Sequence, residues 1–374
     1  MSTVSSNATT ILSQSRTEQQ RFWLLLIGLI SLLFISVTLG VTLGPVEIPA
    51  SAVWRIAAFE TLRRIAEVTT LPVDTWIRIE EDWTTAQFNI VWLIRFPRVL
   101  LGLFVGAGLA IVGVTMQALV RNPLADPYIL GISSGASVGA VSVLAFGAFA
   151  FAGVYALSIG AFLGALLTFF IVFLLAQQNG RILPARLVLS GVAVAYFFSG
   201  LTSFITLTSE QRELARAVLA WLLGSLAGTS WAELTLPVAV LVCGCLILLV
   251  QARSLNSLIV GDETAATLGV NTTRFRRRLF LTVSLITGTM VAVSGAIGFV
   301  GLMIPHMVRL LMGTDHRRVI PISLFVGGIF LIWVDIIART AFDPVELPVG
   351  VITSLLGGPF FLWLLNQQLT NRGG

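Results

Sequence analysis

A cluster of polar residues and prolines lies between two strongly apolar stretches of this chain. Residues 121–127 have the sequence RNPLADP, and the flanking runs at 99–119 and 129–147 are long enough to cross a bilayer as helices. The two prolines stop a helix, and the Asn122 side chain can satisfy backbone groups that are freed there. Irregular backbone at membrane depth is tolerated only beside protein or water. The segment therefore predicts a constriction at the inner mouth of a pathway, with a tight cytoplasmic turn as the plainer alternative.

A second segment that could do chemistry is the polar stretch at 253–278. Its part GDETAATLGV, residues 261–270, predicts a short amphipathic helix that begins after Gly261 and ends at Gly269. An arginine cluster, RFRRR, follows at 274–278. A surface helix lying on anionic lipid headgroups would explain this pattern. We favour the alternative, in which the exposed helix docks onto a cytoplasmic motor subunit.

Three arginines form a third candidate site. Arg95 and Arg98 precede the second predicted span, and Arg339 lies near the outer end of the ninth. Asp335, four residues before Arg339, can pair with it on one helix face. Interfacial snorkelling would explain such side chains without any partner. On a side of the protein that is otherwise acidic, three guanidinium groups also suit the recognition of carboxylates on a partner protein or of an anionic ligand.

Other kinds of chemistry find no support in the residue types. All 23 basic residues are arginine, so the chain lacks the lysine of a Walker A phosphate loop and cannot hydrolyse ATP by that route. His306 and His316 are isolated, and no Ser/His/Asp or paired-carboxylate set stands out. Cys243 and Cys245 lie in an apolar run and are interpreted as lipid- or core-facing hydrophobes. We expect no catalytic residue, metal or cofactor and no nucleic-acid partner, and we rank an intramembrane enzyme low.

The composition indicates the elements that must position these residues. Of the 374 residues, 56% are hydrophobic and only 11% are charged, with a mean hydropathy of +0.94. Soluble domains carry about 25% charged residues, so this is an all-α polytopic membrane protein by expectation. The apolar runs predict ten transmembrane helices, with a short, proline-containing eighth one. They lie at 22–43, 99–119, 129–147, 152–176, 187–207, 232–252, 279–297, 299–313, 319–339 and 347–366.

Charge distribution fixes the expected orientation. With both termini inside, the inner segments hold 14 of the 23 arginines but only 5 of the 18 acidic residues, as the positive-inside rule requires. A run at 217–227 is too short to span and is expected to be a helix on the outer side. If it spanned the membrane, the RFRRR cluster would face outward.

The predicted organisation is therefore one large membrane domain between two short tails. Residues 1–21 are expected to be a cytoplasmic tail, 22–366 the single transmembrane domain and 367–374 a C-terminal tail. An outer loop at 44–94 carries a predicted helix at about 50–66 and an acidic patch, EED, at 80–82. The inner loop is the 253–278 segment described above.

Glycine spacing predicts close helix packing and a weak internal repeat. Small residues four apart recur, and they let membrane helices approach closely; the pairs are Gly102/Gly106, Gly131/Gly135, Gly135/Gly139, Gly160/Gly164 and Gly224/Gly228. Residues 102–117 resemble residues 288–303 in glycine spacing, and in the expected topology they run in opposite directions. Inverted repeats of this kind are common in transporters.

Taken together, these motifs resemble the FecCD-type permease family of ABC importers, which carry iron-siderophores, haem and vitamin B12. The resemblance covers nearly everything from about residue 90 to 366. It rests on RFPR at 95–98, GAGLAIVGVTMQALVRNPLADPYILGISSGA at 106–136, GDETAATLGV at 261–270, GAIGFVGLMIPHMVRLLMGTDHR at 295–317 and LPVGVITSLLGGPFFLWLL at 347–365.

The resemblance implies a type II ABC importer permease fold with an inverted internal repeat, in a bacterial cytoplasmic (inner) membrane and in contact with membrane lipid. Its implied partners are ABC ATPase subunits, a periplasmic or lipid-anchored substrate-binding protein, and a second permease subunit in a homodimer or heterodimer. Arg95, Arg98 and Arg339 match arginines that receive the binding protein, and Asn122 and Leu124 match an inner gate. The residues matching the ATPase-coupling helix are Gly261, Asp262, Glu263, Ala265, Ala266, Leu268, Gly269 and Val270.

The implied function is passage of a ferric siderophore, with haem or vitamin B12 as alternatives. The chain departs from the vitamin B12 permease at a second gate position, where Pro184 and Ala185 replace small hydroxyl residues. Its 44–94 loop is also longer than is usual in the family. An ion-coupled secondary transporter is the main rival, and it needs a titratable group inside a span, for which Asp335 is the one candidate.

Overall fold

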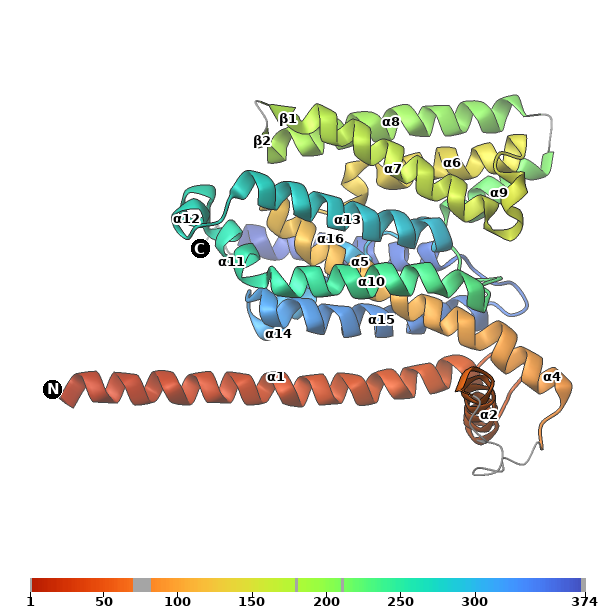
Figure 1. Ribbon diagram of the computed structural model, residues 1–374, viewed down its shortest axis with the longest axis horizontal. Coiled ribbons are helices and arrows are strands. Elements are labelled where there is room, and N and C mark those ends of the chain that lie inside the picture. The colour runs from red at the N-terminus through yellow and green to blue at the C-terminus, as the bar shows by residue number, and fades with distance from the viewer. Residues whose placement is uncertain (1, 70–81, 179–180, 210–211, 371–374) are drawn as a thin grey trace.

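The apolar runs of the sequence form helices that lie side by side in a bundle (Figure 1). The structure, a computed structural model, describes residues 2–69, 82–178, 181–209 and 212–370. Its elements are α1 Ser2–Thr42, α2 Ala50–Thr69, α4 Thr85–Phe88, η1 Asn89–Arg95, α5 Phe96–Val120, η2 Pro127–Leu130, α6 Ile132–Phe146, η3 Ala150–Tyr155, α7 Ala156–Ala176, β1 Gln177–Gln178, β2 Arg181–Ile182, α8 Pro184–Thr208, α9 Arg212–Leu222, α10 Trp231–Val250, α11 Ala252–Val260, α12 Asp262–Thr267, α13 Thr272–Ser294, α14 Val300–Met312, α15 His316–Thr340 and α16 Val349–Thr370.

Each of the ten predicted crossings corresponds to a helix. Among the described residues, eight helical stretches are long and apolar enough to span a membrane, and two shorter apolar helices, α6 and α14, complete the set. The short eighth span is α14, which contains Pro305 as expected. The predicted fold class, an all-α polytopic membrane protein, is confirmed.

Helix α5 passes through the middle of the bundle and packs against α10, α13, α14 and α15 (Figure 1). Nearly all of its residues are buried. Close approach explains its glycines: a Cβ on Gly106 would overlap the carbonyl of Gly327 in α15, and one on Gly113 would overlap the carbonyl of Gly301 in α14. Backbones in contact leave no room for side chains at these crossings, so packing is rigid there.

The pair α6 and α7 uses the same device. Gly135 and Gly139 of α6 face Gly164 and Gly160 of α7, and in each case an added Cβ would overlap the partner's backbone. Together with α8 these helices form one side of the bundle, next to α13 (Figure 1). The small-residue pairs predicted from spacing therefore make direct helix contacts here.

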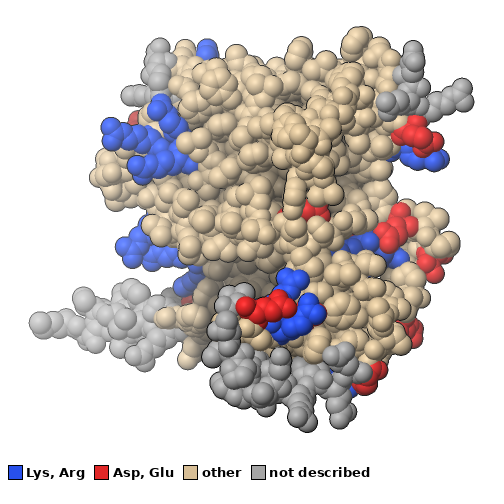
Figure 2. All heavy atoms as spheres, turned by 45° about the vertical axis from the view of Figure 1, so that its right-hand side comes forward, with Lys and Arg blue, Asp and Glu red and all other residues tan. Residues whose placement is uncertain are grey.

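The two ends of the bundle are distinct. We call the end that carries α12 the inner end; the start of α1 lies on the same side, and α2, α4 and α9 lie at the opposite, outer end (Figure 1). In Figure 2 basic side chains gather toward the inner end, and most acidic ones lie toward the outer end. The expected charge asymmetry is visible on the surface.

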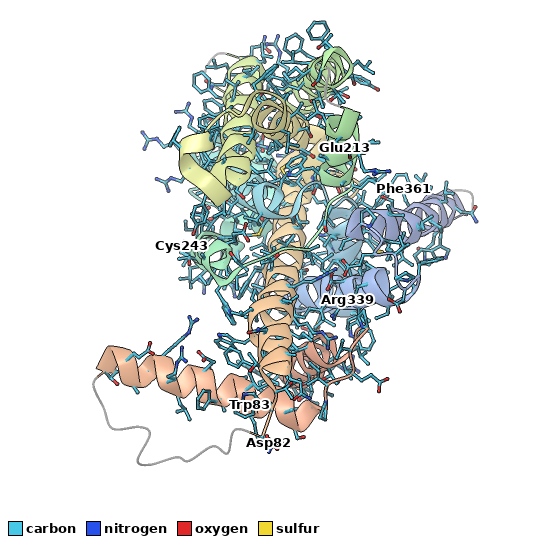
Figure 3. The ribbon with its side chains drawn as sticks, turned by 90° about the vertical axis from the view of Figure 1, so that its right-hand side faces the viewer. Asp82, Trp83, Glu213, Cys243, Arg339 and Phe361 are labelled. Atoms are coloured by element: carbon cyan, nitrogen blue, oxygen red, sulfur yellow. The ribbon has the colours of Figure 1, made fainter. Side chains whose placement is uncertain are left out.

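The outer loop is built on α2, which lies across the end of α1 rather than along it (Figure 1). This is the helix predicted at about 50–66. Asp82, the last residue of the acidic patch and labelled in Figure 3, forms an ion pair with Arg55 of α2 at 2.7 Å. Glu80 and Glu81 lie outside the described residues.

The structure differs from the sequence prediction at two helix boundaries and in one additional helix. The first helix begins at Ser2, so most of the expected N-terminal tail continues α1. The outer helix predicted at 217–227 is α9, Arg212–Leu222, and the chain leaves the helix before Gly224, whose φ of +71° suits a glycine. The inner loop holds a helix not predicted from the sequence, α11, directly before α12.

Candidate functional site

The turn at 121–127 is closed by its own polar side chains. Arg121 ends α5 in the left-handed conformation, with a φ of 54°. The Asn122 carboxamide oxygen accepts a hydrogen bond from the Leu124 backbone N–H at 2.9 Å, and the Asp126 carboxylate accepts one from Tyr128 N–H at 2.8 Å. Asn122 therefore satisfies freed backbone groups as the sequence predicted, and it fixes the position of Leu124.

A second break in the helices lies against this turn. Between α13 and α14 the chain is irregular, and Phe299 has a φ of +68°. The Tyr128 hydroxyl donates a hydrogen bond to the Ile297 carbonyl at 2.9 Å and accepts one from the Ile297 N–H at 2.9 Å. Gln117 donates to the Gly301 carbonyl at 3.3 Å, just past the break. The turn and the break thus form one connected unit.

A cavity of about 590 Å³ opens beside this unit. Its volume falls in the range of small-molecule sites, roughly 300–1,000 Å³. The lining is mostly apolar, with a few hydroxyl groups and one carboxylate, and it comes from η2, α6, α8 and the break before α14; the polar members are Asp126, Tyr128, Ser134, Tyr196 and Ser199. Tyr196 is largely exposed on α8, so this wall of the cavity faces away from the bundle.

The inner end carries an ion cluster that we call the inner junction: Asp262, Arg121 and Arg276. Asp262 is the first residue of α12, and its Oδ1 accepts a hydrogen bond from Arg276 at 2.9 Å and another from Arg121. The Asp262 side chain is 52% exposed, whereas that of Arg276 is 4% exposed. Arg276 also donates to the Leu119 carbonyl in the last turn of α5. The junction therefore links α12 and α13 to the end of α5.

Most of the residues predicted to dock onto a motor subunit lie at the surface. Gly261, with a φ of +152°, and Gly269, with a φ of +82°, bound α12 as the sequence predicted, and both need glycine for their backbone conformation. Ala265 is fully buried and anchors α12 to the domain. Leu268, 65% exposed, presents apolar surface beyond the helix end. The remaining predicted residues, Asp262, Glu263, Ala266 and Val270, are exposed or half-buried.

Helix α11 has its own link to the bundle. The Asn256 carboxamide donates a hydrogen bond to Asp315 at 2.7 Å and accepts one from the His316 N–H at 2.9 Å, at the start of α15. Partial desolvation favours the neutral acid of Asp315, but hydrogen bonds from Asn256 and from the Arg317 N–H outweigh it and hold the pKa of that carboxyl below its usual range. The charged form therefore persists across neutral pH and caps α15.

The three outer arginines meet inside the protein, in a cluster that we call the outer junction: Arg95, Arg98, Arg339 and Asp335. Asp335 accepts from Arg98 at 2.9 Å and pairs with Arg339 at 3.4 Å, as the i,i+4 spacing predicted. Arg95 donates to the carbonyls of Val41 and Thr42 at the end of α1, each at 2.9 Å. Figure 3, which faces the outer end, labels Arg339.

The arginines of the outer junction are buried rather than displayed on the surface for a partner. All three guanidinium groups are buried and have partners within the chain. One partner reaches the surface: Arg98 also pairs at 3.0 Å with Glu346, whose side chain is 49% exposed. Thus the structure brings the three predicted arginines together and adds a competing carboxylate that the sequence analysis did not single out.

Several important pairings have no local signal in the sequence. Asp262 and Arg121 are 141 positions apart, and Arg98 and Glu346 are 248 apart. Asn256 lies in a stretch without a motif. No group of three or more His, Cys, Asp or Glu side chains that could bind a metal ion occurs in the part of the chain that the structure describes.

This chain is similar to proteins of a known transport family. Residues 32–367 match the model of the FecCD transport family. The chain is 46% identical over 285 residues to the cobalamin import system permease protein of Halobacterium salinarum, covering 76% of this chain and 75% of that protein. It is 42% identical over 298 residues to the hemin transport system permease protein of Yersinia pestis, covering 78% and 89%.

A further relative and a solved structure agree with this. The Fe(3+)-citrate import system permease protein of Bacillus subtilis is 41% identical over 278 residues, covering 74% of this chain and 81% of that protein. The fold is similar to a solved inward-facing structure assigned to the metal-chelate type of ABC transporter, with a TM-score of 0.76, 30% identity, and coverage of 91% and 98%. The chain is therefore a multi-pass membrane permease of an ABC importer, and it belongs to the FecCD transport family.

Proposed function

We propose that this permease passes a ferric siderophore, delivered by a substrate-binding protein, across a bacterial cytoplasmic membrane. The 590 Å³ cavity beside the 121–127 turn supports a bulky metal complex as the cargo. Its apolar wall with scattered hydroxyl groups suits a bulky chelate that must bind weakly and move on, because strong, specific contacts would retain the cargo. Relatives named for Fe(3+)-citrate and metal-chelate transport support an iron chelate.

Vitamin B12 is the second candidate, favoured by the 46% identity to a cobalamin permease. Haem follows from the hemin permease at 42% identity. All three cargoes share a bulky, largely rigid metal complex, so the cavity lining does not separate them. The binding protein, which meets the cargo first, is expected to do most of the selecting.

Energy for transport would come from a separate ATPase subunit that docks on α12. Exposed Leu268 and the half-buried Val270 offer apolar surface at the inner end, where a cytosolic partner can cover it. Glu263 and Ala266 lie on the exposed side of the same short helix, whereas buried Ala265 fixes it to the permease. A movement of the ATPase would then displace α12 as a unit.

The gate would be formed by Asn122 and Leu124 together with the same residues of a second copy. The α8 face next to the cavity is apolar and exposed, with Leu189, Tyr196 and Phe197 pointing outward. A second permease subunit on this face would close the cavity into a central pathway and bury these side chains. We propose a homodimer on this ground.

We propose that the binding protein docks at the outer junction and that one of its carboxylates pairs with Arg98. Arg95 and Arg339 both donate to backbone carbonyls of α1, and Arg339 shares Asp335 with Arg98. Because half-exposed Glu346 already pairs with Arg98, an incoming carboxylate would exchange with Glu346 rather than meet a free charge. Electrostatic exchange of this kind sets partner choice more than total affinity.

Reconstitution tests the proposal. The permease, its ATPase and its binding protein are placed in vesicles, and uptake of a ferric siderophore, haem and cobalamin is measured with and without ATP. We expect ATP-dependent uptake of the ferric siderophore and little of the other two. Preferred uptake of cobalamin or haem would reassign the cargo, and uphill uptake without the ATPase would overturn the importer mechanism itself.

A further inference from the structure

The inner junction places one carboxylate oxygen between the two regions that an importer must connect. Asp262 opens α12, the helix on which the ATPase is proposed to dock. Arg121, which donates to the same oxygen as Arg276, is the residue directly before Asn122 in the gate turn. A displacement of α12 would therefore change the distance between the Asp262 carboxylate and the Arg121 guanidinium at the start of the gate turn.

The surroundings of the junction make it a linkage rather than a loose surface pair. Arg276 is buried in α13 and reaches the Leu119 carbonyl of α5. Arg121 also donates, through Nε, to the Leu258 carbonyl of α11 at 3.1 Å. Helices α11, α12 and α13 and the last turn of α5 are thus joined in a closed ring of hydrogen bonds, and Asp262 is its one carboxylate.

Downstream of the ring, the turn transmits position through its own hydrogen bonds. Arg121 adopts the left-handed conformation, and Asn122, the next residue, fixes Leu124 by a bond to its backbone N–H. Arg121 is thus joined to Leu124 by the short backbone of the turn and by the Asn122 side-chain hydrogen bond. Within the described residues, the bond that Arg121 donates to Asp262 is the one side-chain hydrogen bond between α12 and the turn.

We infer that Asp262 is the positioning residue that transmits displacement of α12 to the Asn122–Leu124 gate, through Arg121. The inference rests on the proposed function, in which α12 receives the ATPase. Partial exposure suits this role, because an ion pair of this kind is weak and can break and reform during a cycle. The buried Arg276 keeps one side of the linkage fixed while Arg121 moves.

The test uses the complete importer with its ATPase and binding protein. Asp262→Asn removes the charge but keeps the shape of the side chain. Because Asp262 lies on the proposed docking helix, ATPase binding and the rate of ATP hydrolysis are measured for each variant, and uptake is expressed per ATP hydrolysed. We expect cargo taken up per ATP to fall roughly fivefold or more, the lower bound of a typical coupling between sites. Glu18→Gln is the matched control, because Glu18 also pairs with an arginine at the inner end, Arg318, away from the gate.

Movement of the gate is measured in a protein whose two native cysteines are replaced by Cys243→Ser and Cys245→Ser. Leu124→Cys is added, and the rate at which a thiol reagent on the inner side labels this cysteine measures its accessibility. ATP should change this labelling rate when Asp262 is present but not with Asp262→Asn. Arg121→Gln should give the same defect, and the double variant should be no worse than either single one, since both remove one interaction.

Outcomes separate this inference from the proposed function. If the parent importer transports no chelate with ATP, the proposed function fails. If the parent transports and Asp262→Asn keeps full coupling, or if the defects of Asp262→Asn and Arg121→Gln add independently, the inference is overturned while the proposed function stands. Rescue by Asp262→Glu, which restores the carboxylate, would support it.

Discussion

The outer and inner junctions contain the same residue types, two or three arginines near one aspartate. They differ in solvent exposure. The Asp335 side chain is 2% exposed, and that of Asp262 is 52% exposed. Arg98 contacts both Asp335 oxygens, whereas a single oxygen of Asp262 serves two arginines. Burial makes the first cluster costly to open, and exposure makes the second one easy to rearrange.

This difference in solvent exposure indicates different roles for the two junctions. The outer junction joins α1, α5 and α15 through Arg95, Arg98 and Arg339, and it contacts backbone carbonyls of α1 that have no other helical partner. It is therefore a fixed anchor with one exchangeable contact, Glu346. The inner junction connects a proposed docking helix to a proposed gate, and both need to move.

The largest expected effect comes from breaking the anchor. Asp335→Asn leaves Arg98 and Arg339 buried without their shared counter-charge, and removing one partner of a buried ion pair costs about 3–5 kcal/mol. The purified permease should show a clearly lower Tm in detergent. Asp343→Asn, an exposed outer acid, is the control and should leave the Tm within a degree or so.

The same variant separates the importer from an ion-coupled carrier. If Asp335 were a coupling site, Asp335→Asn would abolish dependence of uptake on a proton or sodium gradient. We expect ATP-driven uptake to be independent of both gradients in the parent protein, so a gradient requirement would contradict the importer assignment.

An intermediate effect should come from the inner junction, where burial differs between the two arginines. Arg276→Gln removes a buried guanidinium that satisfies both Asp262 and the Leu119 carbonyl, so unfolding free energy should fall by about 1–3 kcal/mol. Arg121→Gln, at a site about one-third exposed, should change it by less than about 1 kcal/mol. Equal losses in denaturant unfolding would remove the distinction between a fixed and a movable arginine.

The smallest effect is expected at the exchangeable outer contact. Glu346→Gln removes the carboxylate that competes for Arg98, so binding-protein affinity should rise, by roughly two- to fivefold for a pair of this exposure. Arg98→Gln should lower it. Both are measured by surface binding to permease in nanodiscs, with Glu47→Gln, an exposed outer acid, as control. Unchanged affinity in both variants would remove Arg98 from the docking surface.

Much of the fold was predictable because bilayer physics leaves a clear signal in sequence. A span needs about 20 apolar residues, and all ten predicted crossings correspond to helices. Glycines bounded α12 where expected, since only glycine readily adopts the conformations of Gly261 and Gly269. Helix ends without such a signal were less predictable: α1 continues back to Ser2, and α11 was missed.

By itself, the sequence determined the all-α membrane class, the apolar helices and the family, because each depends on local composition or contiguous motifs. Only the tertiary structure decided which charges meet. Asp262 joins Arg121 across 141 residues, and Asp335 joins Arg98 across 237. Helix packing brings these groups together, and burial, a property of the packed bundle rather than of any segment, makes one cluster an anchor and leaves the other open to water.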